Sequence, residues 1–252
     1  MKTHPVILST SAGPVGAVVT LPRGEVKGVA VTLPGWNSTR AGINQVWARL
    51  AVSLSSIGVG AVRFDYPGTG ESHACQLDRW MEGTTEVIEW VRRRLGHERL
   101  LLVAECGGVV PAHFQVTRYP DGVAAVAHVL PAVTVPGEAP RLPRVFRITD
   151  NTTWPRDVLE AGSRSNDMLV EIGQAVPLWV LAAPDDPATG LLAALLPALR
   201  AGVGFELEVA PPATKGPSHW PGEQEVVNCA TAWAARHIGP VASVFSDQSE
   251  EG

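Results

Sequence analysis

The sequence predicts an α/β fold: one domain with a mostly parallel central sheet of about eight strands and helices on both faces. Two observations support this prediction. Short apolar runs alternate along the chain with stretches whose apolar residues recur every three or four positions, the spacing of amphipathic helices. Several of the runs are continuously apolar, which is typical of strands buried on both faces of a parallel sheet. The 252 residues are enough to bury a large core.

The chain is expected to open with a β-hairpin. Residues 6–8 and 15–21 are apolar and rich in β-branched side chains, which favour strands. Between them, residues 11–14 read Ser-Ala-Gly-Pro, a composition typical of a turn. These two stretches are therefore predicted to pair with each other.

A strand–helix–strand unit is predicted next. Residues 28–33 and 59–64 are continuous apolar runs, followed by Pro-Gly and by Asp-Tyr-Pro-Gly respectively. Between them, apolar residues from 43 to 57 have helical spacing. This order indicates a right-handed crossover within a parallel sheet.

The alternation continues to the C-terminal part of the chain with one interruption. The remaining predicted elements are helix 80–95, strand 100–104, helix 109–116, strand 123–130, strand 177–183, helix 191–199, strand 205–210 and helix 223–237. Between residues 131 and 175 the periodicity fails and prolines are frequent, so a lid or insertion is expected within a single domain spanning 1–245. The polar residues 246–252 are expected to be a disordered tail.

Composition excludes several classes of function. Twenty Lys and Arg against 25 Asp and Glu leave a net charge of −5, so the chain lacks the basic surface of a nucleic-acid-binding protein. No apolar run reaches the roughly 18 residues of a membrane helix, and no signal peptide is recognised, so a cytoplasmic protein is expected. Three widely spaced cysteines, Cys75, Cys106 and Cys229, argue against a disulfide framework or a bound metal. No cofactor motif is found, and the oligomeric state stays open.

The candidate nucleophile follows the strand at 100–104. Residues 104–108 read Ala-Glu-Cys-Gly-Gly and lead directly into a helix, the pattern of a nucleophile with small residues two positions away on each side. The small residues are needed because a sharp strand-to-helix turn leaves no room for bulk beside the neighbouring strand and helix. Cys106 would then lie at a helix N-terminus, where the helix dipole favours the thiolate.

Two further loops carry catalytic residue types. Asp185 and Asp186 follow the strand at 177–183, and His219 follows the strand at 205–210. In an open parallel sheet, loops beyond the carboxyl ends of the strands meet at one edge. The chain order of nucleophile, acid and histidine is that of the α/β hydrolases.

Several motifs, in the order that the family has them, resemble the α/β-hydrolase fold family over most of residues 28–238. The strand-to-helix turn at Cys106 resembles the nucleophile elbow of this family, and the acid and histidine loops lie in the corresponding places. In addition, residues 33–36 (Leu-Pro-Gly-Trp) resemble its oxyanion loop. Residues 63–72 (Arg-Phe-Asp-Tyr-Pro-Gly-Thr-Gly-Glu-Ser) resemble its R-F-D-x-x-G-x-G-x-S segment. Cys106 stands where most members have serine, which is similar to the dienelactone hydrolase-like and thioesterase-like branches.

The resemblance implies a role for each residue of a Cys-His-Asp triad. Cys106 would be the nucleophile, and His219 the general base and later the general acid. Asp186 would orient the histidine, with Asp185 as the alternative. The backbone N–H groups of Trp36 and Gly107 would form the oxyanion hole. In addition, Trp154 and Trp220 are candidates for lining the substrate pocket.

A sulfur nucleophile favours substrates with a good leaving group. A thiolate leaves a tetrahedral intermediate more readily than an alkoxide does, so activated esters, lactones or thioesters are expected. The prediction is a hydrolase or acyl-transfer enzyme acting on a small acyl substrate, free or carrier-bound, in secondary metabolism. Two alternatives remain open: a lyase that eliminates an acyloxy group such as acetate, and a non-catalytic fold that binds a small ligand or a protein partner.

Overall fold

The computed structural model describes residues 1–36, 38–72, 79–131, 164–183, 187–210 and 222–238, and these alone are considered below. Their strands are β1 (Lys2–Thr10), β2 (Gly13–Leu21), β3 (Gly28–Leu33), β4 (Val59–Phe64), β5 (Leu100–Cys106), β6 (Val123–Pro131), β7 (Leu178–Ala182) and β8 (Phe205–Val209). Their α-helices are α1 (Val46–Ser56), α2 (Trp80–Leu95), α3 (Val109–Arg118), α5 (Ser165–Ala175), α6 (Pro187–Arg200) and α7 (Glu223–His237). Short 3-10 helices are η1 (Ile43–Gln45), η2 (Gly70–Ser72) and η4 (Pro120–Gly122).

The eight strands form one sheet in the order β1-β2-β4-β3-β5-β6-β7-β8. β1 pairs antiparallel with β2, and β2 pairs antiparallel with β4. Every other neighbouring pair, from β4 and β3 to β7 and β8, is parallel. The prediction of a mostly parallel sheet is therefore confirmed, with the hairpin supplying the antiparallel edge.

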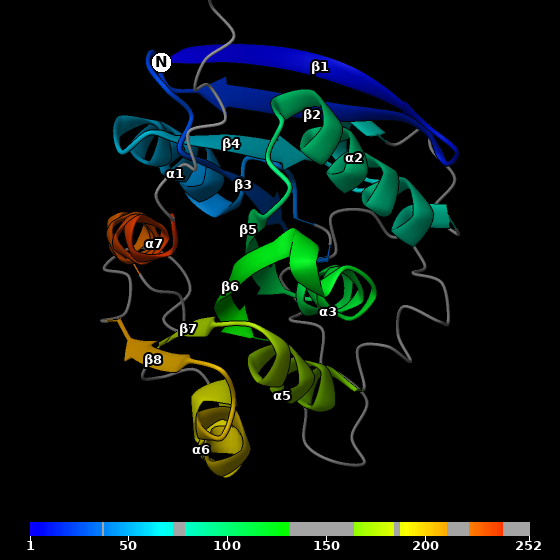
Figure 1. Ribbon diagram of the computed structural model, residues 1–252. Coiled ribbons are helices and arrows are strands. Elements are labelled where there is room, and N and C mark those ends of the chain that lie inside the picture. The colour runs from blue at the N-terminus through cyan, green and yellow to red at the C-terminus, as the bar shows by residue number, and fades with distance from the viewer. Residues whose placement is uncertain (37, 73–78, 132–163, 184–186, 211–221, 239–252) are drawn as a thin grey trace, which may run out of the picture.

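Two hydrophobic layers cover the sheet. Helices α1 and α7 lie together on one face, while α2, α3 and α5 lie on the other (Figure 1). The first layer buries Trp47, Trp179 and Trp233. The second layer buries Trp80 and Leu102, together with leucines of α6. Because successive side chains of a strand point to opposite faces, the continuous apolar strands supply both layers.

Most predicted elements are confirmed, and four of them (β3, β4, α2 and α7) have the predicted bounds. The hairpin is longer than predicted, since β1 begins at Lys2 and pairs with β2 as far as Leu21. β1 contains Pro5, which an edge strand tolerates because one side of its backbone needs no partner. Helix α6 begins at Pro187, before the predicted residue 191, because proline suits the first turn of a helix.

The segment 131–175, predicted to be a lid or insertion, contains helix α5. The side chains of Leu169 and Ile172 on this helix are buried in the same layer as α3. Residues 165–175 thus cover the sheet, and their helical spacing was hidden by the proline-rich sequence before them. Residues 132–163, the larger part of the predicted lid or insertion, lie outside the described residues, as does the predicted tail, so both stay predictions.

No helix among the described residues combines the length and the apolar character that crossing a membrane requires.

Candidate functional site

Cys106 is the last residue of β5 and lies at a sharp turn into α3. Its φ of +46° is in the left-handed region, which residues with a Cβ rarely adopt. Only Gly107 and Gly108 separate it from the first residue of α3. Its side chain is partly exposed, whereas the six preceding residues of the strand are buried. A strained, partly exposed cysteine between a strand and a helix has the geometry predicted for a nucleophile elbow.

The turn after β3 packs directly against this elbow. A Cβ atom at Gly108 would lie 2.3 Å from the carbonyl oxygen of Leu33, so a larger residue could not occupy this position without moving the backbone. A Cβ atom at Gly35 would lie 3.3 Å from the Cβ of Cys106. Glycine at both positions therefore allows β3, β5 and α3 to approach each other at the site.

The two residues predicted to form the oxyanion hole are neighbours in space. The indole of Trp36 covers Gly107, because a Cβ atom added there would lie 2.5 Å from Trp36 Nε1. Trp36 is only 6% exposed. The structure thus brings Trp36, Gly107 and Cys106 together, while the hydrogen bonds of the two backbone N–H groups to an oxyanion remain a prediction.

A buried carboxylate, Glu105, lies immediately before the candidate nucleophile. It is 2% exposed and accepts hydrogen bonds from the backbone N–H of Gly35 (3.3 Å) and from Trp47 Nε1 (3.0 Å). The side chain of Ser38 also hydrogen-bonds to it. Burial raises the pKa of Glu105, and the three hydrogen bonds act in the opposite direction. No role was assigned to Glu105 from the sequence.

Tyr66 adds a buried phenol to the surroundings of the site. It packs edge-on against Phe64 and Trp80, and among the described residues its hydroxyl has no hydrogen-bond partner. Burial, and then the negative charges of Glu105 and Cys106, raise the pKa of Tyr66 well above its ordinary value. The phenol is therefore protonated at neutral pH. Sequence reasoning did not single out Tyr66, although it belongs to the 63–72 motif.

The rest of the 63–72 motif connects the loops that follow β3 and β4. Asp65, fully buried, accepts hydrogen bonds from the backbone N–H groups of Arg40 (2.7 Å) and Glu71 (3.0 Å). It also pairs with the guanidinium of Arg40. The guanidinium of Arg63 donates to the carbonyl oxygen of Arg40 (2.9 Å). The motif therefore supports the loop that leads from the Pro-Gly-Trp turn to α1, and so has a structural role.

A buried histidine, His128, lies on β6 opposite Ala104 of β5. It has no solvent exposure, and neither ring nitrogen has a hydrogen-bond partner of normal geometry among the described residues. Burial lowers the pKa of His128 to about 3, and the backbone of Cys106 acts in the opposite direction. His128 is therefore neutral at physiological pH.

The other predicted site residues lie outside the described residues. These are the triad histidine His219, both acid candidates Asp185 and Asp186, and the pocket candidates Trp154 and Trp220. The strands that precede the acid and histidine loops, β7 and β8, are parallel neighbours with Ala182 opposite Val209. Both strands run parallel to β5. The carboxyl ends of β7 and β8 therefore point to the same side of the molecule as the carboxyl end of β5, where Cys106 lies.

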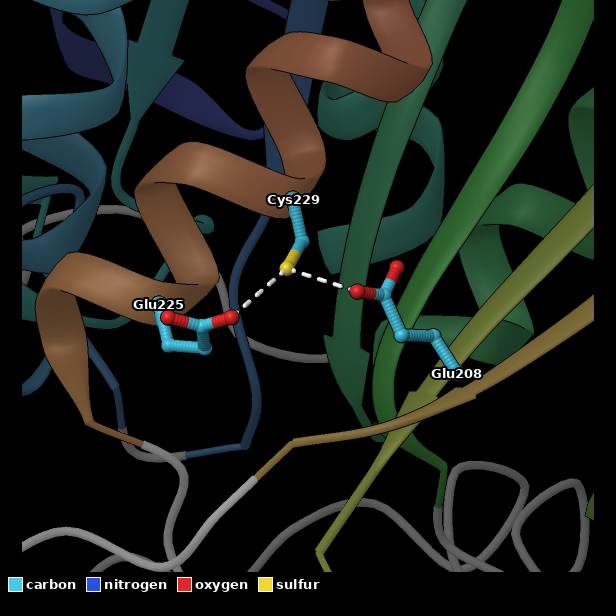
Figure 2. Close-up of side chains that lie close together, drawn as sticks. All are labelled: Glu208, Glu225 and Cys229. Atoms are coloured by element: carbon cyan, nitrogen blue, oxygen red, sulfur yellow. Dashed lines mark hydrogen bonds between the residues drawn. The ribbon is translucent and has the colours of Figure 1, made fainter.

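A second thiol, Cys229, lies near the far edge of the sheet in a different environment (Figure 2). Its Sγ is 3.0 Å from Oε1 of Glu208 on β8 and 3.5 Å from Oε1 of Glu225 on α7. Glu208 also accepts a hydrogen bond from Trp179 Nε1 (3.2 Å). Burial and the two carboxylates raise the pKa of Cys229 far above its ordinary value. This thiol is a protonated hydrogen-bond donor, which makes it a poor nucleophile.

Comparisons with known proteins identify the fold. No family model matches the chain, and no curated protein matches its sequence. Among solved structures, Est1E from Butyrivibrio proteoclasticus with bound ferulic acid is similar, with a TM-score of 0.72 and 13% identity over 92% of this chain and 99% of that one. A thermostable carboxyl esterase from Bacillus coagulans has a TM-score of 0.70 and 11% identity, over 95% and 100% of the two chains.

A third similar structure has a different named activity. Proline iminopeptidase from Mycobacterium smegmatis has a TM-score of 0.63 and 14% identity over 93% of this chain and 99% of that one. At such low identity these likenesses concern the fold and not the reaction. Together with the strand order, they show that the chain has the α/β-hydrolase fold.

Proposed function

We propose that this protein is a hydrolase or acyl-transfer enzyme that acts on activated esters, lactones or thioesters through a Cys106-His219-Asp186 triad. The observation that carries the proposal is the strained backbone of Cys106 (φ +46°) between β5 and α3, with the Pro-Gly-Trp turn packed against it. One of the similar structures described above, that from Bacillus coagulans, is named as a carboxyl esterase, which supports ester cleavage as the reaction class.

The position of Cys106 favours its anionic form. The thiol lies beside the N-terminus of α3, a helix of ten residues whose dipole stabilises a negative charge there. The neighbouring Glu105 has the opposite effect, since a carboxylate disfavours a second negative charge nearby. His219 is proposed to remove the thiol proton, with Asp186 holding the imidazole in the correct orientation.

The proposed reaction has two steps. The sulfur of Cys106 attacks the acyl carbon, and the bond from that carbon to the leaving oxygen or sulfur breaks as His219 returns its proton to the leaving group. Water or another nucleophile then attacks the thioester, loses its proton to His219, and releases the acyl product and the thiol. A free thiol has a pKa of about 8.5, so the intermediate goes forward when the substrate's leaving group is comparably stable.

Cysteine substitution tests the proposal. Cys106→Ala should lower turnover of p-nitrophenyl acetate and of an acetyl thioester by at least about 10³-fold, because the variant lacks the sulfur that is proposed to carry the acyl group. The matched control is Cys229→Ser, which keeps a hydrogen-bond donor toward Glu208 and Glu225 and should retain activity. Intact-mass analysis of wild type mixed with substrate should show one acyl adduct, absent from Cys106→Ala. Full activity of Cys106→Ala would contradict nucleophilic catalysis by this residue.

A further inference from the structure

The carboxyl group of Glu105 is buried, which is energetically unfavourable for an acidic side chain. Burying a carboxylate without adequate partners costs several kcal/mol, so a buried glutamate is retained only where hydrogen bonds compensate for the lost water. Glu105 lies on a central strand, next to the candidate nucleophile, and is 2% exposed. The proposed reaction steps make no use of its side chain.

The three donors to Glu105 described above come from the loop that follows β3 and from the start of α1. Gly35 donates through its backbone N–H, and Ser38 through its side chain. Trp47, at the start of α1, donates through Nε1. Ser38 is in turn tied to Gly35, because its N–H donates to the Gly35 carbonyl oxygen at 3.0 Å. One carboxylate on the nucleophile's strand therefore holds both ends of the loop that follows β3.

The anchored atoms include the amide group one residue before the expected oxyanion donor. The N–H of Gly35 is fixed by Glu105, and the next N–H along the chain is that of Trp36. Gly35 also approaches Cys106 closely, and the Trp36 indole covers Gly107. A shift of this loop would therefore move Trp36 relative to the carbon that Cys106 attacks.

We propose that Glu105 is a positioning residue, which fixes the Gly35–Trp36 peptide against the Cys106 elbow so that the oxyanion hole is preformed. This inference rests on the proposed function, since an oxyanion develops only when Cys106 attacks a carbonyl group. Glu105 does not touch the reacting atoms in this account. It acts through Gly35, Ser38 and Trp47, and its carboxylate makes the adjacent thiol harder to ionise.

Two reactions of the same thiol separate this role from general support of the fold. Turnover of p-nitrophenyl acetate develops charge on a carbonyl oxygen and needs the oxyanion hole. Alkylation of Cys106 by iodoacetamide forms a C–S bond and expels iodide, with no charge on a carbonyl oxygen. Loss of the anchor should therefore slow turnover and leave alkylation as fast as before or faster.

Two groups of variants test these hydrogen bonds: one changes the acceptor, Glu105, and the other removes single donors. Glu105→Ala should lower kcat by about 10²-fold with KM changed less than about threefold, in line with loss of an oxyanion donor. Glu105→Gln, which keeps the shape and one acceptor oxygen, should show a smaller loss. Trp47→Phe and Ser38→Ala remove single donors and should each lower kcat by about three- to tenfold. Thermal melting identifies variants that fail to fold, in which case Glu105→Gln and the donor variants decide the test.

The matched control is Glu208→Gln, which alters a similar hydrogen bond between a glutamate and a tryptophan indole, with Trp179, far from the elbow. It should retain wild-type turnover. If the folded Glu105 variants keep kcat within twofold while Cys106→Ala is inactive, the positioning role is wrong and the proposed function stands. If turnover and alkylation fall together, Glu105 merely supports the elbow, which also overturns the inference. If wild type neither turns over substrate nor forms an acyl adduct, the proposed function fails and the inference falls with it.

Discussion

Cys106 has a left-handed backbone, a conformation that costs a residue with a Cβ about 1–3 kcal/mol. Beside it, Glu105 buries a carboxylate and His128 an uncharged imidazole, both of which forfeit contact with water. These three residues lie on the adjacent strands β5 and β6. Three features that each lower the stability of the folded protein, one strained backbone and two buried polar side chains, thus lie close to one cysteine. Such a concentration is typical of a site maintained for function rather than for stability.

The pH dependence of stability should reveal His128. Its pKa is about 3 in the folded protein and about 6.5 in an unfolded chain, so between these pH values only the unfolded state binds the proton. The contribution of His128 to the free energy of unfolding is therefore fully present above pH 6.5. Below that pH it falls by at most about 1.4 kcal/mol per pH unit. At pH 5 the loss should be about 2 kcal/mol.

Urea unfolding of wild type and His128→Leu at pH 8 and pH 5 measures this contribution. At pH 8 the imidazole is uncharged in both states, so the difference between the two proteins there gives the effect of packing alone. The variant should lose about 2 kcal/mol less than wild type between the two pH values. Equal losses would show that His128 is protonated in the folded protein or exposed to water.

At the level of elements, the site depends on how closely α3 and β3 approach each other at the elbow. Gly108 has helical backbone angles, so its glycine is required by space and not by conformation. Gly96, the residue that follows α2, shows the opposite case, because its φ is +69°. A Cβ atom added there would have no contact within 4 Å with other parts of the described chain. Substitution of Gly108 therefore tests steric contact between two elements, and substitution of Gly96 tests backbone strain within one element.

Alanine at each position should distinguish the two effects. Gly96→Ala should lower the free energy of unfolding by about 1 kcal/mol, the cost of a left-handed alanine, with activity retained. Gly108→Ala should cost about 3 kcal/mol, because its methyl group would overlap the Leu33 carbonyl oxygen and push α3 from β3. It should also lower turnover, since the elbow moves with α3. Chemical unfolding and ester turnover measure both; equal effects of the two substitutions would contradict the steric argument.

For the whole molecule, the two hydrophobic layers share one sheet. Leu50 of α1 lies in the layer with α7, and Leu102 of β5 lies in the layer with α2 and α3, each with no exposed surface. Because every central strand contributes side chains to both layers, loss of one layer removes support for the strands of the other. The sheet therefore couples the two layers into a single folding unit.

Cavities in the two layers should consequently have similar effects. Leu50→Ala and Leu102→Ala should each lower the free energy of unfolding by about 2–5 kcal/mol and leave a single transition. Far-UV circular dichroism and tryptophan fluorescence should give the same midpoint in denaturant for each variant. Separate midpoints in either variant would show that the layers unfold independently.

The position of the elbow could be predicted from the sequence, because small residues around a cysteine after an apolar strand form a local pattern. The bounds of β3, β4, α2 and α7 were also predictable, since turn residues interrupt the apolar periodicity there. Helix α5 was missed because proline-rich sequence precedes it. The roles of His219 and Asp186 stay predictions, as these residues lie outside the described part of the chain.

By itself, the sequence determined the alternation of strands and helices and the placement of a cysteine at a strand-to-helix turn, because both depend on residues close together in the chain. Only the tertiary structure decided what surrounds that cysteine. Gly35 and Trp47 are 70 and 58 positions from Glu105, and Tyr66 comes from another strand end. Such contacts depend on which strands become neighbours in the sheet, and local periodicity is the same whichever neighbours are chosen.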